Sequence, residues 1–176
     1  MARVSLIKEE DHPELAEIIG QIRGARRGRL INVYRLLLHS PALAKAWFTL
    51  NNAVRWKTGI TGRLRELVII RIGYLCDAPY ILRQHIPALA AAEGVSAVEC
   101  EALQDWQEGS LFDGRERVVL EYADSLTRAG RAGDELFARL KGFFNEGQLV
   151  ELTVLVGAYN MHARVLNAFE LDLENA

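Results

Sequence analysis

Two ionisable side chains, Glu66 and His85, occur in consecutive stretches whose composition suits buried helices. Glu66 lies among aliphatic residues in the segment 65–71 (RELVIIR), and His85 ends the segment 76–85 (CDAPYILRQH). Burial among aliphatic side chains disfavours the charged form of a carboxylate, so the sequence predicts a raised pKa for Glu66. Because the imidazole of histidine titrates near neutral pH, the two groups together are a candidate pair for proton transfer.

Each of these residues also has a purely structural interpretation. Glu66 could lie at the rim of its helix and pair with Arg63 one turn back, a contact that stabilises an isolated helix by about 0.2–0.5 kcal/mol. His85 could be a half-buried histidine whose ring bonds a nearby carbonyl. Tyr80 is a secondary candidate, because on an ideal helix it points away from the face that carries His85.

The elements that must position these groups are predicted to be helices. Apolar residues recur at intervals of three and four and strand signals are nearly absent, so the fold class is predicted to be all-α. Capping patterns at Ser96, Asp113 and Asn145 mark three helix starts, and Asp77 is the expected N-cap of the helix that carries His85. The predicted helices cover residues 12–20, 30–37, 41–56, 62–75, 78–93, 97–107, 114–129, 134–143 and 146–170.

The domain organisation follows from length and from one glycine-rich segment. A chain of 176 residues, half of them hydrophobic, is expected to bury one core. Residues 20–29 contain three glycines and four arginines, a composition typical of a flexible connection. We therefore expect an amino-terminal arm and connection at residues 1–29, followed by one helical domain at residues 30–176.

Composition and spacing also exclude several function classes. A formal net charge of −2 and an isoelectric point near 6.1 give no basic field for nucleic acid. The chain has neither an apolar run of the roughly 18 residues that cross a bilayer nor a secretory signal, so we expect a cytoplasmic protein without a membrane partner. Cys76 and Cys100 form no disulfide framework, and no metal-ligand spacing joins the histidines, so no metal is expected.

The segment around Glu66 and His85 resembles the carboxymuconolactone decarboxylase family, which includes the AhpD-like alkylhydroperoxidases. The resemblance is carried by the start RELVII at residues 65–70, by the spacing from Tyr80 to His85 and by the alanine-rich helix that follows. It implies an AhpD-like helical bundle that forms a homotrimer or homohexamer. It also implies Glu66, His85 and Tyr80 as the catalytic residues, with no cofactor.

Peroxidase members of this family carry a Cys-x-x-Cys motif whose positions fall here on Ala78 and Ile81. The chain therefore resembles a longer member that lacks this motif. The leading hypothesis is a lyase of carboxymuconolactone decarboxylase type acting on a small carboxylated lactone or related acid. In it, His85 protonates the enolate that remains after carbon dioxide leaves, and Glu66 sets the tautomer and charge of the ring.

Three questions stay open at this point. Arg71 and Arg83 are both candidates to bind the carboxylate of the substrate. Alkylhydroperoxidase-type antioxidant activity is a second hypothesis, although Cys76 would have to act as a lone thiol. A third hypothesis is a non-catalytic oligomer that binds a small acid or a partner protein and keeps Glu66 and His85 as a structural pair.

Overall fold

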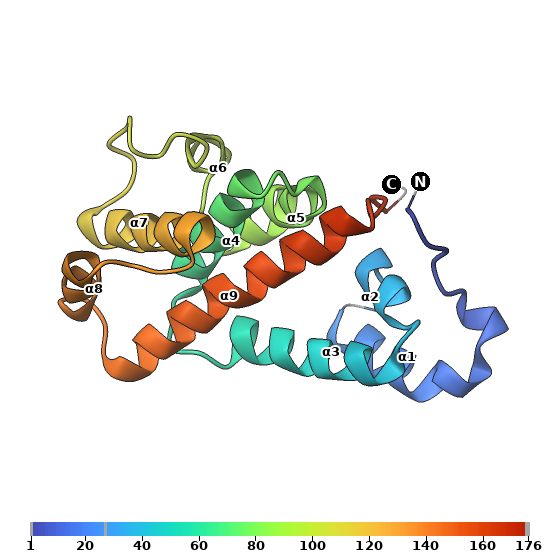
Figure 1. Cartoon of the computed structure of the whole chain (residues 1–176). Helices are drawn as coiled ribbons and strands as arrows, with labels where there is room; N and C mark the ends of the chain where they lie inside the picture. The colour runs from blue at the N-terminus through green and yellow to red at the C-terminus, as the bar shows by residue number, and fades with distance from the viewer. Residues whose placement is uncertain (1, 27, 175–176) are drawn as a thin grey trace. The chain divides into compact units, whose positions relative to one another are not determined.

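The computed structural model describes residues 2–26 and 28–174, and all regular structure within these two ranges is helical (Figure 1). Met1, Arg27 and residues 175–176, which belong to the predicted arm and to the end of the predicted domain, lie outside the described residues. The all-α prediction is confirmed. The helices are α1 (Ala16–Ala25), α2 (Asn32–Leu37), α3 (Pro41–Trp56), α4 (Gly62–Leu75), α5 (Pro79–His85), α6 (Ala97–Ala102), α7 (Gly114–Ala129), α8 (Asp134–Lys141) and α9 (Glu146–Ala168).

The chain divides into two compact units. The first consists of Met1–Ala53 together with Leu166–Ala176, and the second is Val54–Val165. The predicted division into residues 1–29 and 30–176 stays a prediction. The two candidate residues of the site, Glu66 and His85, both belong to the second unit.

The first unit has a small apolar core of its own. Its buried side chains are Ile7, Leu15, Ile19, Leu38 and Ala44. The helix predicted at residues 12–20 begins instead at Ala16 and continues to Ala25, so it runs through part of the glycine-containing segment expected to be a flexible connection. Its buried residues, Ile19 and Ile22, lie three apart, and this helical spacing outweighs the low helix propensity of the glycines.

Helix α4 is the central element of the second unit and packs against α5 and α7 (Figure 1). Every residue from Leu64 to Gly73 is buried, so the helix has no solvent-facing side over this length. Arginine side chains are ordinarily exposed. The arginines at 65 and 71 are buried as well because other elements supply their hydrogen-bond acceptors.

A tight turn joins α4 to α5 and fixes where the second helix begins. Asp77 adopts a left-handed backbone conformation with φ of 47°. The amide of Ala78 bonds the carbonyl of Gly73 at 2.8 Å, and the amide of Asp77 bonds the carbonyl of Tyr74 at 3.2 Å. These two bonds form a Schellman motif, which ends α4. The N-cap of α5 is therefore Ala78, and the prediction that Asp77 is the N-cap is wrong.

Helix α5 ends at His85 and continues as a π-helical turn over Ile86–Ala90. The predicted helix 78–93 is thus interrupted in its middle. The cause is Pro87, which has no amide hydrogen and whose ring clashes with the carbonyl four residues earlier in a regular α-helix. The wider turn relieves this clash and leaves His85 at the junction between the two geometries.

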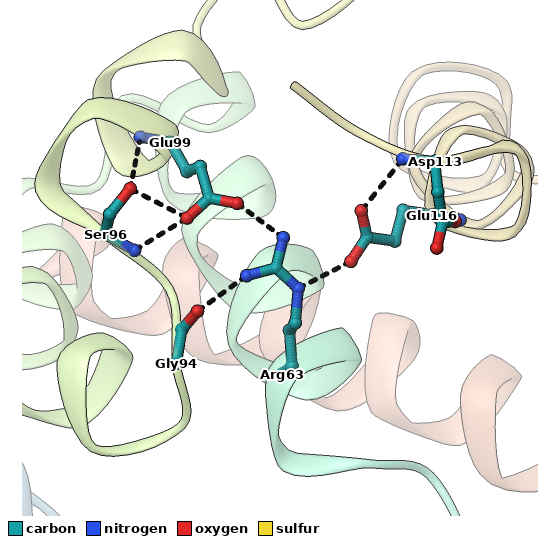
Figure 2. A network of polar contacts seen from close by, with 6 residues as sticks. All are labelled: Arg63, Gly94, Ser96, Glu99, Asp113 and Glu116. Atoms are coloured by element: carbon teal, nitrogen blue, oxygen red, sulfur yellow. Dashed lines mark hydrogen bonds and ion pairs between the residues drawn. The ribbon is translucent and has the colours of Figure 1, made fainter. Parts of the chain in front are cut away.

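Arg63 links the starts of two helices (Figure 2). Ser96 and Glu99 form a capping box at the start of α6, and Asp113 and Glu116 form another at the start of α7, as the sequence predicted. The Arg63 guanidinium donates to Glu99 Oε1 at 2.5 Å, to Glu116 Oε1 at 2.6 Å and to the Gly94 carbonyl at 2.6 Å. Arg63 therefore pairs with these two carboxylates.

Candidate functional site

The Glu66 and His85 side chains are in direct contact. Nδ1 of His85 lies 2.6 Å from Oε2 of Glu66. Glu66 is completely buried, and only 6% of His85 is exposed. The contact depends on the Schellman turn, since that turn folds α5 back onto α4. The rim position considered for Glu66, with Arg63 as its partner, is therefore wrong.

Arg65 connects the pair to the surrounding structure. Its Nε donates to Oε1 of Glu66 at 3.4 Å, a long hydrogen bond. Its two terminal nitrogens donate to the Arg55 carbonyl at 2.8 Å and to Oε1 of Glu93 at 2.7 Å. Each oxygen of the Glu66 carboxylate thus has a donor, and the carboxylate is held in one orientation.

The pKa values of the two groups are set by burial and by their neighbours. Burial raises the pKa of Glu66, but the hydrogen bond and electrostatic interaction with His85 and the charges of Arg55 and Arg65 outweigh it and leave this pKa below its ordinary value. The sequence-based prediction of a raised pKa for Glu66 is therefore wrong, because it considered only the aliphatic neighbours. Burial lowers the pKa of His85, and the opposing effect of Glu66 does not restore it.

These pKa directions define the ground state of the pair at neutral pH. Glu66 is ionised, and His85 is a neutral ring whose Nδ1–H donates to the carboxylate. No described residue donates to or accepts from Nε2 of His85. This nitrogen therefore carries the lone pair of the neutral ring and is the atom that can exchange a proton with a ligand.

Two aromatic residues of α9, Tyr159 and His162, lie beside this ring. The Tyr159 ring meets the His85 ring edge-on, with 5.6 Å between the ring centroids. His162 stacks on the other side of Tyr159 at 5.4 Å with an interplanar angle of 21°. Sequence reasoning assigned neither residue a role beside His85. The apolar spacing did predict a helix over residues 146–170, but it could not indicate which helix it meets.

The other predicted candidates occupy different environments. Tyr80 is 4% exposed on α5, and its catalytic role stays a prediction. Ala78 and Ile81, at the positions of the family thiols, are buried apolar side chains. Cys76 is partly buried, and burial raises the pKa of its thiol despite the nearby charge of Arg164.

The two arginines proposed to bind a substrate carboxylate differ in their surroundings. Arg71 donates to both oxygens of Asp124, at 2.6 and 2.7 Å, and to the carbonyls of Leu103 and Gln104. Its donors are therefore occupied by the protein. Arg83 is exposed on α5.

Residues 2–26 and 28–174 contain no group of three or more histidine, cysteine, aspartate or glutamate side chains placed to hold a metal ion. No helix within these ranges is both long enough and apolar enough to cross a membrane.

Comparison with known proteins identifies relatives of this chain. The sequence model of the carboxymuconolactone decarboxylase family matches residues 41–125. An uncharacterised protein of Escherichia coli K12, YnjA, is 33% identical over 113 residues, which cover 63% of this chain and 61% of YnjA. The chain thus spans less than two thirds of the length of this relative.

Two solved structures share the fold. The alkylhydroperoxidase AhpD core of a peroxidase-related protein from Ralstonia eutropha JMP134 superposes with a TM-score of 0.84, at 16% identity, over 99% of this chain and 93% of that one. A putative antioxidant defence protein AhpD from Agrobacterium tumefaciens gives a TM-score of 0.74 at 24% identity, over 80% of this chain and 97% of that one. At these identities the likeness concerns the fold.

Proposed function

Because residues 41–125 of this chain belong to the carboxymuconolactone decarboxylase family and its helical fold is AhpD-like, we propose that the protein is an acid–base enzyme. Its substrate is a small carboxylated lactone or a related acid, and the reaction needs no cofactor. The observation that carries this proposal is the buried hydrogen bond of 2.6 Å between His85 Nδ1 and Glu66 Oε2. It fixes the tautomer of the ring and directs the reactive nitrogen, Nε2, away from Glu66.

A proton cycle through His85 follows from this geometry. In the free protein the ring is neutral, and an anionic carboxylate bound within electrostatic range of the ring favours its imidazolium form, so His85 takes up a proton when the substrate binds. The bond from the substrate carbon to its carboxylate then breaks, carbon dioxide leaves, and the electron pair stays on the lactone as an enolate. The imidazolium Nε2–H donates its proton to the enolate carbon, and the ring returns to its neutral form beside Glu66.

The test compares His85→Gln and Glu66→Gln with the control His162→Gln, which removes a histidine that is separated from His85 by the Tyr159 ring. Carbon dioxide release from carboxymuconolactone and related lactone acids is the measurement. Loss of proton transfer should reduce kcat by roughly 10²- to 10⁴-fold in the first two variants. The control should retain activity. Turnover that persists in folded His85→Gln protein would contradict the proposal.

The same variants test the alternative of a non-catalytic oligomer that binds a small acid or serves as a scaffold. Removing one partner of a buried hydrogen bond costs about 1–3 kcal/mol of folding free energy. If the pair is only structural, both variants lower the free energy of unfolding, while acid binding by the folded fraction stays unchanged. Urea denaturation and ligand titration of the same samples separate these outcomes.

Alkylhydroperoxidase-type antioxidant activity is less well supported. The AhpD-like fold favours it, but the positions of the two thiols are occupied by Ala78 and Ile81, and the raised pKa of Cys76 reduces its thiolate fraction. Any hydroperoxide consumption should therefore be weak and abolished by Cys76→Ser. Robust turnover in a variant without Cys76 and Cys100 would show that another group reacts with peroxide.

We also propose that the protein forms a homotrimer or homohexamer. Val150, Val154 and Met161 are exposed on α9 at spacings of four and seven residues, which places them along one face of the helix. An exposed apolar face of this kind is typical of a subunit contact. Sedimentation at micromolar concentration should reveal a species larger than a monomer. The expected cytoplasmic location and the absence of nucleic-acid and membrane partners stay predictions.

A further inference from the structure

Three arginines of the second unit are more than nine-tenths buried, and they differ in their hydrogen bonds. Arg65 and Arg71 donate from all three of their guanidinium nitrogens to protein acceptors. Arg55 is 8% exposed, and its Nε and Nη2 are buried with no acceptor among the described residues. A buried donor nitrogen without a hydrogen bond is unfavourable, so this edge of the side chain has unused capacity to bind an anion.

The unpaired nitrogens of Arg55 form one edge of the guanidinium. Arg71 shows what this edge binds, because its Nε and Nη2 donate to the two oxygens of Asp124 at 2.6 and 2.7 Å. The two parallel bonds match the geometry of a carboxylate. The same edge of Arg55 therefore suits a carboxylate that the protein itself does not supply.

Arg55 belongs to the surroundings of the proton-transfer pair. Its carbonyl accepts from Arg65, whose Nε reaches Glu66. The charge of Arg55 lowers the pKa of both Glu66 and His85. An anion bound by Arg55 would therefore lie within electrostatic range of His85.

Trp56 covers this arginine and is itself exposed. The carbon at the centre of the Arg55 guanidinium lies 4.6 Å from the Trp56 ring centroid, and that of Arg65 lies 4.9 Å from the same centroid. Trp56 is 54% exposed, so more than half of its surface already faces solvent, and rotation of the ring exchanges its two guanidinium contacts for water. Movement of an exposed ring is the least costly way to open a route to buried nitrogens beside it.

We propose that Arg55 is the anchor for the ligand's carboxylate, which its Nε and Nη2 bind after the Trp56 ring moves aside. This assignment rests on the proposed function, since it names the group that holds an acid substrate next to His85. Arg55 binds the carboxylate through two hydrogen bonds, and the remainder of the ligand meets Nε2 of His85. The bound anion offsets the charge of Arg55, which favours protonation of the ring.

The experiment uses paraconate, a stable carboxylated lactone, and its uncharged analogue γ-butyrolactone as probes. Binding is measured by NMR titration of the wild-type protein and of Arg55→Gln, Arg55→Lys and Arg83→Gln. Loss of two charge-assisted hydrogen bonds should weaken paraconate binding by roughly 10- to 100-fold in Arg55→Gln. Arg55→Lys retains the charge without the planar edge and should fall between this variant and the wild type. The exposed control Arg83→Gln should bind like the wild type, and γ-butyrolactone should not distinguish the variants.

A role for Arg55 in folding alone predicts different results. Removing two buried donors that have no acceptor within the described residues should leave the melting temperature of Arg55→Gln unchanged or higher, whereas a structural role lowers it. Paraconate should also raise the pKa of His85, followed through its ring proton resonances, in the wild type but not in Arg55→Gln. Wild-type protein that does not bind paraconate, or Arg55→Gln that binds it equally well, would overturn the anchor.

Failure of the anchor and failure of the proposed enzyme are distinguishable. Turnover that requires His85 but is insensitive to Arg55→Gln would support the proposed enzyme and contradict the role of Arg55 as anchor. Binding of paraconate that requires Arg55, without decarboxylation of any lactone acid, would support the anchor and contradict the proposed enzyme.

Discussion

The second unit contains two buried clusters of charged residues that differ in whether their hydrogen-bond donors have acceptors. In one, Arg71 and Asp124 satisfy each other, and the remaining donor of the arginine, Nη1, reaches the carbonyls of Leu103 and Gln104, which follow α6 directly. In the other, Glu66 and His85 share a short hydrogen bond, while two buried nitrogens of neighbouring Arg55 have no acceptor within residues 2–26 and 28–174. The guanidinium nitrogens of Arg71 in the first cluster are therefore all hydrogen-bonded, whereas the second cluster contains two donors that are not bonded within the same residues.

This difference indicates what each cluster contributes. A buried ion pair whose hydrogen bonds are all made holds elements together, and removal of one partner leaves an uncompensated charge. A cluster with unmet donors stabilises the fold less than its residues allow and is typical of a site that binds a ligand. We therefore expect changes in the first cluster to affect stability and changes in the second to affect binding and proton transfer.

The largest effect is expected when Asp124 is removed. Asp124→Ala leaves Arg71, which is 3% exposed, without its carboxylate, and the free energy of unfolding should fall by about 3–5 kcal/mol. Urea denaturation measures this loss. Arg128→Ala is the matched control, because Arg128 is an exposed residue 4.0 Å from the same carboxylate and should contribute about 0–1 kcal/mol. A loss for Asp124→Ala that is no larger than that of the control would contradict the comparison.

An intermediate effect is expected at Arg63, whose guanidinium joins two capping boxes but is partly exposed (Figure 2). Arg63→Met keeps most of the aliphatic stem and removes the donors to Glu99 and Glu116. Since hydrogen bonds to charged groups contribute about 1.5–3 kcal/mol and solvent weakens them here, a loss of about 1–2 kcal/mol is expected. A double-mutant cycle with Glu99→Gln measures the coupling. Additive losses would show that the two side chains do not interact in solution.

The smallest effect concerns the pH dependence of stability. Burial lowers the pKa of His85 from 6.5, so as pH falls below 6.5 the unfolded chain takes up this proton first and the folded state is destabilised. The contribution of neutral His85 to folding stability is present above pH 6.5 and is lost as the pH falls towards the lowered pKa of the folded state. His85→Gln should therefore remove this part of the change in unfolding free energy with pH. For one proton that change cannot exceed about 1.4 kcal/mol per pH unit.

Glu99 gives the corresponding control in a different pH window. The hydrogen bond from Arg63 lowers the pKa of Glu99 from 4.5 to about 2, so its contribution is present above pH 4.5 and is lost between pH 4.5 and about 2. Glu99→Gln should flatten part of the pH dependence in that lower window and leave the window near pH 6 unchanged. If His85→Gln leaves the pH dependence of stability near pH 6 unchanged, the lowered pKa inferred for His85 is wrong.

Much of the fold was predictable because local signals agreed with the final structure. The capping boxes at Ser96 and Asp113 form, and α3, α4 and α7 have the predicted bounds. Errors occurred where one residue changes the backbone locally. Pro87 widens the helix after His85, and Asp77 takes a left-handed conformation, two effects that average spacing does not reveal.

For the candidate site too, some features were predictable from local sequence and others depend on the tertiary structure. The sequence by itself determined that a carboxylate at 66 and an imidazole at 85 lie on consecutive helices, because helical spacing is a local property. Only the tertiary structure decided that Glu66 is ionised, since its pKa depends on donors and charges contributed by His85, Arg55 and Arg65. Likewise, Arg71 and Arg55 look alike in the sequence. Which of them has acceptors is decided by segments far along the chain, such as Asp124, that no local pattern connects to either residue.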